Sequence, residues 1–185
     1  MWKRSRYLGT FVIALFLGSC AASGPRITTQ SNPVVDFSGF NTFNFMSPMG
    51  TDRPGGVTTP LSMMLAGAVT EELQSRGFAL SDEPDLLINV FINTEQRVDV
   101  RQTPTATGFY GYRRNRYGTW GGYRTEVRQY TEGTMVIDLI DARQNMLAWE
   151  GIAEKRLSSN ASQINQQQVD AVVGAILAEF PYAAR

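Results

Sequence analysis

The sequence predicts an α+β domain in which a four-stranded antiparallel or mixed sheet has two helices packed on one face. Three observations predict this fold class. Extended segments with a period of two cover 86–93 and 135–140, and apolar residues recur at helical spacing over 61–73 and 169–180. In chain order the elements read β-α-β-β-β-α, for which helices gathered on one face of the sheet are the economical arrangement.

The expected strands differ in how strongly their patterns specify them. They are Val35–Phe37 with Phe43–Phe45, then Leu86–Asn93, Arg124–Asp141 and Met146–Arg156. Leu86–Asn93 has apolar residues on both faces, as a central strand would. The last two should form a hairpin through a turn that opens at Asp141, and Gly151 is expected to mark a bulge.

The first helix has a clear beginning and end in the sequence. Thr59 is a suitable N-cap, and Pro60 suits the first helical position. At the other end, Gly77 fits the left-handed residue of a Schellman ending, in which Leu73 and Phe78 make the accompanying apolar contact.

The second helix covers the C-terminal apolar stripe from Val169 to Phe180. Asn160 with Gln163 resembles a capping box at its start. Pro181 ends it, because the residue before a proline is disfavoured in the helical region.

The N-terminus has the layout of an export signal. Basic residues at 3–6 precede an apolar run over 7–17, which is too short to span a bilayer, where about 20 residues are needed. The run leads to Cys20, the only cysteine. The tetrapeptide Leu17 to Cys20 resembles the lipobox of bacterial lipoproteins, which implies cleavage before Cys20, a diacylglycerol anchor on its thiol and a further acyl chain such as palmitate. The alternative is ordinary cleavage near 21–23, which would release a soluble secreted protein.

The chain therefore divides into a signal peptide over 1–19, a lipidated cysteine with a flexible tether over 20–33, and one globular domain over 34–185. Three of the 17 basic residues leave with the signal, so 14 remain against 17 acidic residues. This net charge of about −3 gives no general attraction to nucleic acid. Because no cysteine remains for a disulfide, apolar packing must hold the domain together.

One segment of the expected domain is unusual in composition. A loop rich in Gly, Tyr and Arg is expected at about 98–124. Aromatic side chains suit a membrane interface and arginines attract anionic head groups, so the segment is a candidate surface contact. The residues proposed for this contact are Arg113, Arg114, Arg116, Tyr117 and Trp120. The alternative is a long connection without specific binding, and the exported location argues against nucleic acid as the ligand.

Composition excludes most catalytic chemistry. The chain has no histidine, and its one cysteine is expected to be acylated, so Ser-His-Asp and Cys-His nucleophiles and zinc sites built on these ligands are excluded. No metal or cofactor is predicted. Carboxylates remain, and Asp138 and Asp141 are expected on opposite faces of their strand, with Asp141 opening a turn. An enzyme that acts on an envelope polysaccharide through Asp138, Asp141 or Glu150 is the alternative from another functional class.

Several segments together resemble the bacterial lipoproteins grouped as domain of unknown function 4136. The most specific are Gly133–Asp141, with the pattern Gly-Thr-x-x-x-Asp-x-x-Asp, and Trp149-Glu150-Gly151. The others are Asp36-Phe37-Ser38 with Phe43 and Phe45, Pro84-Asp85-Leu86-Leu87 and Phe180-Pro181. The resemblance covers nearly all of the mature chain and implies an exported lipoprotein domain without an assigned activity.

These observations predict a non-enzymatic envelope lipoprotein that acts by binding or scaffolding on the periplasmic side. Its expected partners are the membrane, through the anchor, and an envelope protein or an anionic glycolipid. Ala21 rather than Asp follows the cysteine, which under enterobacterial-type sorting favours the outer membrane over the inner membrane.

Overall fold

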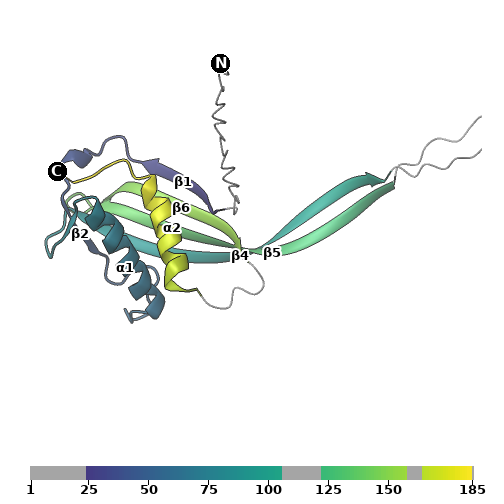
Figure 1. The fold of residues 1–185 in the computed structure, drawn as a ribbon, viewed down its shortest axis with the longest axis horizontal. Coiled ribbons are helices and arrows are strands. Elements are labelled where there is room, and N and C mark those ends of the chain that lie inside the picture. Colours follow the sequence, from purple (N-terminus) through teal and green to yellow (C-terminus); the bar gives the residue numbers. More distant parts are fainter. Residues whose placement is uncertain (1–23, 106–121, 158–163, 185) are drawn as a thin grey trace, which may run out of the picture.

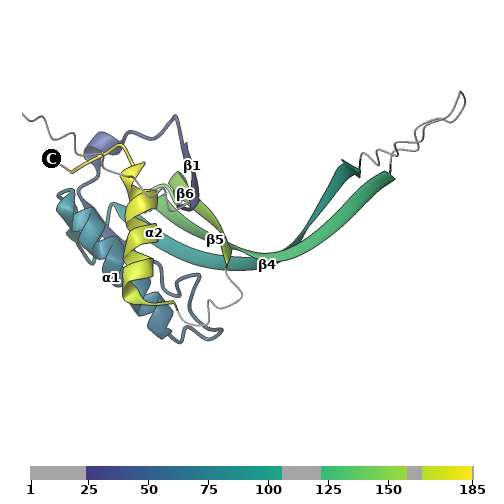
Figure 2. The same cartoon turned by 45° about the vertical axis from the view of Figure 1, so that its right-hand side comes forward.

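The computed structural model describes residues 24–105, 122–157 and 164–184. In these residues two helices cover one face of a six-stranded sheet (Figures 1 and 2). The strands are β1 (Arg26–Ser31), β2 (Thr42–Phe45), β3 (Ala79–Leu80), β4 (Leu86–Thr105), β5 (Gly122–Asp141) and β6 (Met146–Leu157). The helices are α1 (Pro60–Ser75) and α2 (Gln166–Ala178), with a short 3-10 helix η1 (Phe37–Gly39). The mixed α+β fold with two helices is confirmed, but the sheet has six strands and not four.

The strands lie in the order β1-β6-β5-β4-β2-β3. β1, β6, β5 and β4 pair antiparallel, whereas β2 is parallel to both β4 and β3. Parallel neighbours need a crossover connection, and α1 supplies it between β2 and β4. No described helix is long and apolar enough to cross a membrane.

The extra strand β1 lies inside the segment expected to be a tether. Arg26–Ser31 pairs with β6 over its whole length, from Arg26 opposite Glu154 to Ser31 opposite Trp149. Most of its side chains are exposed. Its pairing with β6, together with the packing of Ile27 against the core, places it at the edge of the sheet. The tether prediction was therefore wrong for these residues.

The expected strand at Val35–Phe37 is also absent. The Asp36 side chain accepts a hydrogen bond of 2.9 Å from the Ser38 N–H and caps η1. This local bond offers the backbone an alternative to strand pairing. Phe37 is buried beneath the C-terminal segment, where its ring stacks on Tyr182 with centroids 4.0 Å apart.

Both ends of α1 match the prediction. The Thr59 hydroxyl accepts a hydrogen bond of 3.0 Å from the Ser62 N–H. At the C-terminus, the Phe78 N–H donates to the Leu73 carbonyl at 3.1 Å and Gly77 has a φ of 91°, which is the Schellman arrangement.

The start of α2 differs from the prediction. Its capping box is formed by Asn165 and Gln168, each side chain bonding the backbone of the other. Asn160 and Gln163 lie outside the described residues. The correct box is five residues further along, directly before the apolar stripe.

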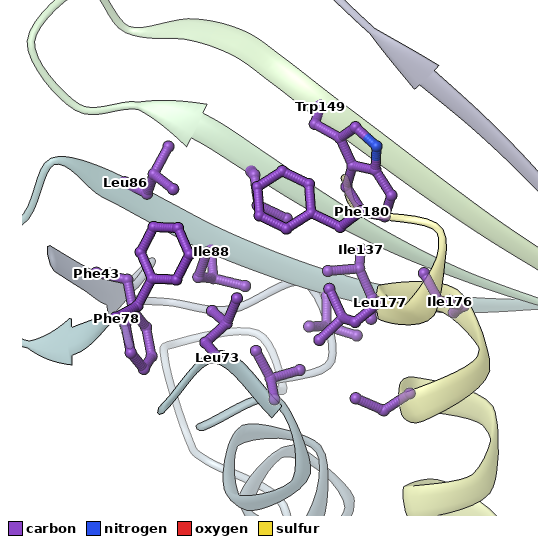
Figure 3. Close-up of a cluster of buried hydrophobic side chains, with 14 of the residues drawn as sticks. Phe43, Leu73, Phe78, Leu86, Ile88, Ile137, Trp149, Ile176, Leu177 and Phe180 are labelled. Atoms are coloured by element: carbon purple, nitrogen blue, oxygen red, sulfur yellow. The ribbon is translucent and has the colours of Figure 1, made fainter. Parts of the chain in front are cut away.

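The core lies between the helices and the sheet face that they cover (Figure 3). Leu86, Ile88 and Val90 of β4 are fully buried there, as the alternation predicted. Trp149 of β6 packs edge-on against Phe180, with ring centroids 5.2 Å apart. The register between β5 and β6 shifts between Leu139 and Ile140 of β5, so the bulge of β6 lies at 147–149 and not at Gly151.

Asp85 fixes the junction between β2 and β4. Its carboxylate accepts hydrogen bonds from the Asn41 and Thr42 N–H groups at 2.9 and 3.1 Å, and it pairs with Arg143 at 2.5 Å. Burial alone would raise the pKa of Asp85, but these hydrogen bonds and the Arg143 charge together lower it. The ionised carboxylate therefore stabilises the folded chain at neutral pH.

Replacing Gly151 with Ala should destabilise the domain. An added Cβ would overlap Ile176 Cγ2 of α2 and the Trp149 ring. We expect Gly151→Ala to lower the free energy of unfolding by about 1–3 kcal/mol, measured by urea unfolding. Gly67→Ala is the matched control, because no atom lies within 4 Å of its added Cβ in the exposed part of α1. It should stabilise by roughly 0.5–1 kcal/mol. Equal stability of Gly151→Ala and the parent chain would contradict this packing.

Candidate binding arm

β4 and β5 continue together well beyond the rest of the sheet. β6 pairs with β5 only from Thr131 onward, so residues 97–105 and 122–130 form a ribbon of two strands, here called the arm. Nine residues of extended strand span about 30 Å. Figures 1 and 2 show the arm projecting from the body, with no described element over either face. The loop expected at about 98–124 is therefore strand at both of its ends.

The arm separates charged from uncharged residues. One face continues the buried row of the body and carries no charge; we call it the uncharged face. It consists of Val98, Val100, Gln102, Pro104, Tyr123, Thr125, Val127 and Gln129. The opposite face, the charged face, holds every charged residue of the arm. These are Arg97, Asp99, Arg101, Arg124, Glu126 and Arg128.

Most charges on the charged face are compensated by neighbours. Arg97 bonds Glu132 at 2.6 Å at the base of the arm. Arg128 and Glu126 are 2.7 Å apart, and Arg101 lies 3.4 Å from Asp99. The three arginines are at least half exposed, although Glu132 and Asp99 are less so. Surface pairs of this kind are individually worth only about 0–1 kcal/mol, but they mark this face as one that water solvates. With four arginines against two carboxylates within the arm, its charge is positive.

The residues proposed for surface contact belong to the segment that joins the two strands of the arm. All five lie within 106–121, outside the described residues: Arg113, Arg114, Arg116, Tyr117 and Trp120. Cys20 also lies outside the described residues, near the N-terminus. Thr105 and Gly122, the residues before and after this segment, are paired. This segment therefore connects the two strands where the arm ends.

The carboxylates singled out in the sequence lie at two separate places. Asp138 is on the sheet face away from the helices, between Asn89 of β4 and Glu150 of β6. Asp141 is buried at the end of β5, where its carboxylate accepts hydrogen bonds from the Arg143 and Gln144 N–H groups at 2.8 and 3.1 Å. Asp141 therefore opens the turn, as expected.

Asp138 has an unusual environment. Burial raises its pKa, and the negative charge of Glu150 raises it further, against the opposing effect of a hydrogen bond with Asn89. Its Oδ1 atom is buried without a hydrogen-bond partner. No group of three or more His, Cys, Asp or Glu side chains close enough to hold a metal ion occurs among the described residues.

Sequence reasoning predicted the second strand of the arm from Arg124 onward but missed the first strand, the extension of β4 over 97–105, although a signal for it exists. From Gln96 to Gln102 uncharged and charged residues alternate strictly. This is the period of a strand. The signal is weak because two of the four uncharged members, Gln96 and Gln102, are themselves polar, so hydrophobicity alternates only over the centre of the run.

Comparison with solved structures supports the fold. The chain is similar to a PDZ domain protein from Parabacteroides distasonis, with 18% identity and a TM-score of 0.56, over 86% of this chain and 36% of that chain. It is also similar to two PelC dodecamer structures from Paraburkholderia phytofirmans, with 13% and 11% identity and TM-scores of 0.47 and 0.44. These matches cover 87% of this chain and 98% and 99% of the PelC chains. The likeness to the first protein shows the fold alone.

The family is shown by a separate comparison. No curated protein matches the chain. The family model described as Domain of unknown function (DUF4136) matches residues 27–182, which include every strand and helix from β2 to α2 and all but the first residue of β1. The chain therefore belongs to the DUF4136 family.

Proposed function

We propose that this chain is a non-enzymatic lipoprotein of the bacterial envelope, anchored through Cys20 on the periplasmic side of the outer membrane, that acts by binding through its arm. The observation that carries this proposal is the continuation of β4 and β5 as a ribbon beyond the body. Binding residues are often carried on loops that a rigid scaffold positions, and here the scaffold is the arm.

The chemistry of the carried segment favours an anionic partner. Arg113, Arg114 and Arg116 lie within four residues of one another, with Tyr117 and Trp120 close behind. The positive charge of the arm itself adds to theirs. Arginine binds phosphate through two parallel hydrogen bonds, and aromatic rings suit the boundary between head groups and acyl chains. An anionic glycolipid of the envelope offers both features.

A second candidate function is favoured by Asp138 and Glu150. A carboxyl group that holds its proton beside an ionised partner is the arrangement by which many glycoside hydrolases supply a general acid. Asp138 has a raised pKa and lies directly opposite Glu150. In this alternative, the two acids would act on an envelope polysaccharide.

The anchor is tested by the mass of the mature chain. We expect the purified protein to begin at Cys20 and to carry diacylglycerol with a further acyl chain, because two or more chains are needed for stable membrane attachment. Intact-mass spectrometry measures this, and Cys20→Ala should move the protein from the membrane fraction to the soluble fraction. A bare thiol at residue 20 or an uncut leader would remove the anchor from the proposal.

Binding by segment 106–121, which joins the strands of the arm, is tested with vesicles. A chain that begins at Ala21 keeps every core residue and lacks the anchor. It should bind vesicles of phosphatidylglycerol more strongly than vesicles of phosphatidylcholine. Replacing Arg113, Arg114 and Arg116 with Ser should weaken this binding on the order of 100-fold at low salt, from about 1 kcal/mol for each arginine near a charged surface.

The matched control removes the same charge from the body. Arg26, Arg53 and Lys155 are exposed and lie outside the arm, and their replacement with Ser should weaken vesicle binding much less. The readout is flotation with the vesicles across a series of salt concentrations. Equal losses from the two triple variants would show that net charge, and not the arginines of segment 106–121, controls binding.

Asp138→Asn tests the second candidate. Because the folded chain holds the Asp138 proton more tightly than the unfolded chain, stability should fall as pH rises from about 3.8 through the raised pKa. Asp138→Asn removes this loss, so it should be more stable than the parent at pH 7.5 by a few tenths to about 1 kcal/mol, and equally stable near pH 3.5. Urea unfolding at both pH values measures this difference in stability, with Glu150→Gln as the companion variant.

An activity assay tests the enzyme itself. Release of reducing ends from envelope polysaccharide by the parent chain, and loss of that release in both variants, would favour the enzyme.

A further inference from the structure

The uncharged face of the arm has no partner among the described residues. Val98, Val100 and Val127 are 56%, 56% and 58% exposed, and Tyr123 is 70% exposed. Val100 and Val127 lie directly opposite each other near the middle of the arm. A two-stranded ribbon alone is at best marginally stable in water, and it gains stability when one face is covered. A cover for this face would therefore stabilise the whole arm.

The two faces of the arm fit different surroundings. On the charged face, neighbouring side chains already form ion pairs, so that face suits water or the anionic partner proposed above. The uncharged face offers no charged side chain with which it could bind a charged partner. A matching cover would be an extended surface of similar length, free of charge and carrying small apolar side chains at its centre.

The uncharged face itself meets this description. We propose that the arm of one copy packs against the arm of a second copy through their uncharged faces, about a two-fold axis near Val100 and Val127. An interface of this kind is self-complementary by symmetry, since each residue meets the patch to which it belongs. Two ribbons stacked face to face would lie about 10 Å apart, with the valines of both copies between them. The charged faces would then point outward on both sides.

The area of the contact sets its strength. A strip about 30 Å long and two strands, or about 10 Å, wide gives a footprint of roughly 300 Å² on each copy. The total of roughly 600 Å² is below the 1,200–2,000 Å² of stable complexes, so the pair is weak in dilute solution. Confinement of both copies to one membrane surface would raise their effective concentration and populate the pair. That increase depends on the proposed anchor, whereas the pairing itself does not.

Cysteine trapping tests the pairing with a control only one residue away. Val100→Cys places a thiol on the uncharged face, and Arg101→Cys places one on the charged face at similar exposure. Both full-length variants and the parent are expressed in a bacterial host, and the envelopes are oxidised with copper phenanthroline. We expect a disulfide-linked homodimer to form with Val100→Cys at least about tenfold faster than with Arg101→Cys, because pairing brings the thiols close to the two-fold axis.

Three outcomes would overturn the pairing: equal rates for the two variants, no dimer with Val100→Cys, or a disulfide to a different protein. The parent controls for the thiol of Cys20. The same comparison on full-length Cys20→Ala chains, purified in detergent at about 1 mM, separates this proposal from the anchor. A preference for Val100→Cys that persists there supports the pairing even if the anchor fails. Circular dichroism and urea unfolding confirm that both variants fold.

Discussion

The structure depends on one register, the 20 consecutive antiparallel pairs that join β4 to β5. In the body, burial fixes it, because Ile88 and Val90 must face the helices while Asn89 faces away. A slip of one residue would exchange the two faces and place Asn89 in the core. The arm has no core of its own and inherits this register. Burial at one end of the ribbon thereby decides which residues share a face about 30 Å away.

Closure of the core depends on a close approach of α2 to β6. The absence of a side chain at Gly151 lets Ile176 reach the sheet beside the Trp149 ring. The bulge opposite Leu139 and Ile140 buries Ala148 and Trp149 in succession, which a regular strand would direct to opposite faces. Trp149 then meets Phe180 directly after the end of α2. The glycine and the bulge together let one bulky ring fill the space between the sheet and the C-terminal segment.

The sequence predicted elements whose cause is local and missed those whose cause is distant. The Schellman ending needs only Leu73, Gly77 and Phe78, all within six residues. β1 has almost no apolar pattern, because backbone bonds to a strand more than 100 residues away hold it at the edge. β3 is only two residues long, too short to show any period. For the candidate site, the sequence shows the basic and aromatic residues from Arg113 to Trp120, and the alternation over 96–102 is a weak local sign of a strand before them. That this strand pairs with β5 as an arm follows from the register that the body fixes.

Loop entropy does not explain why such an arm exists. Pairing its strands shortens the expected connection over 98–124 to 106–121, from 27 to 16 residues. Because closure entropy grows only with the logarithm of length, this shortening is worth about 0.5 kcal/mol. Ordering the paired residues costs more than that, at roughly 1–2 kcal/mol for each backbone. The arm must therefore be stabilised by its ladder, and the proposed pairing of uncharged faces would add to this. Its consequence for the proposed function is reach, since its two strands end about 30 Å beyond the body.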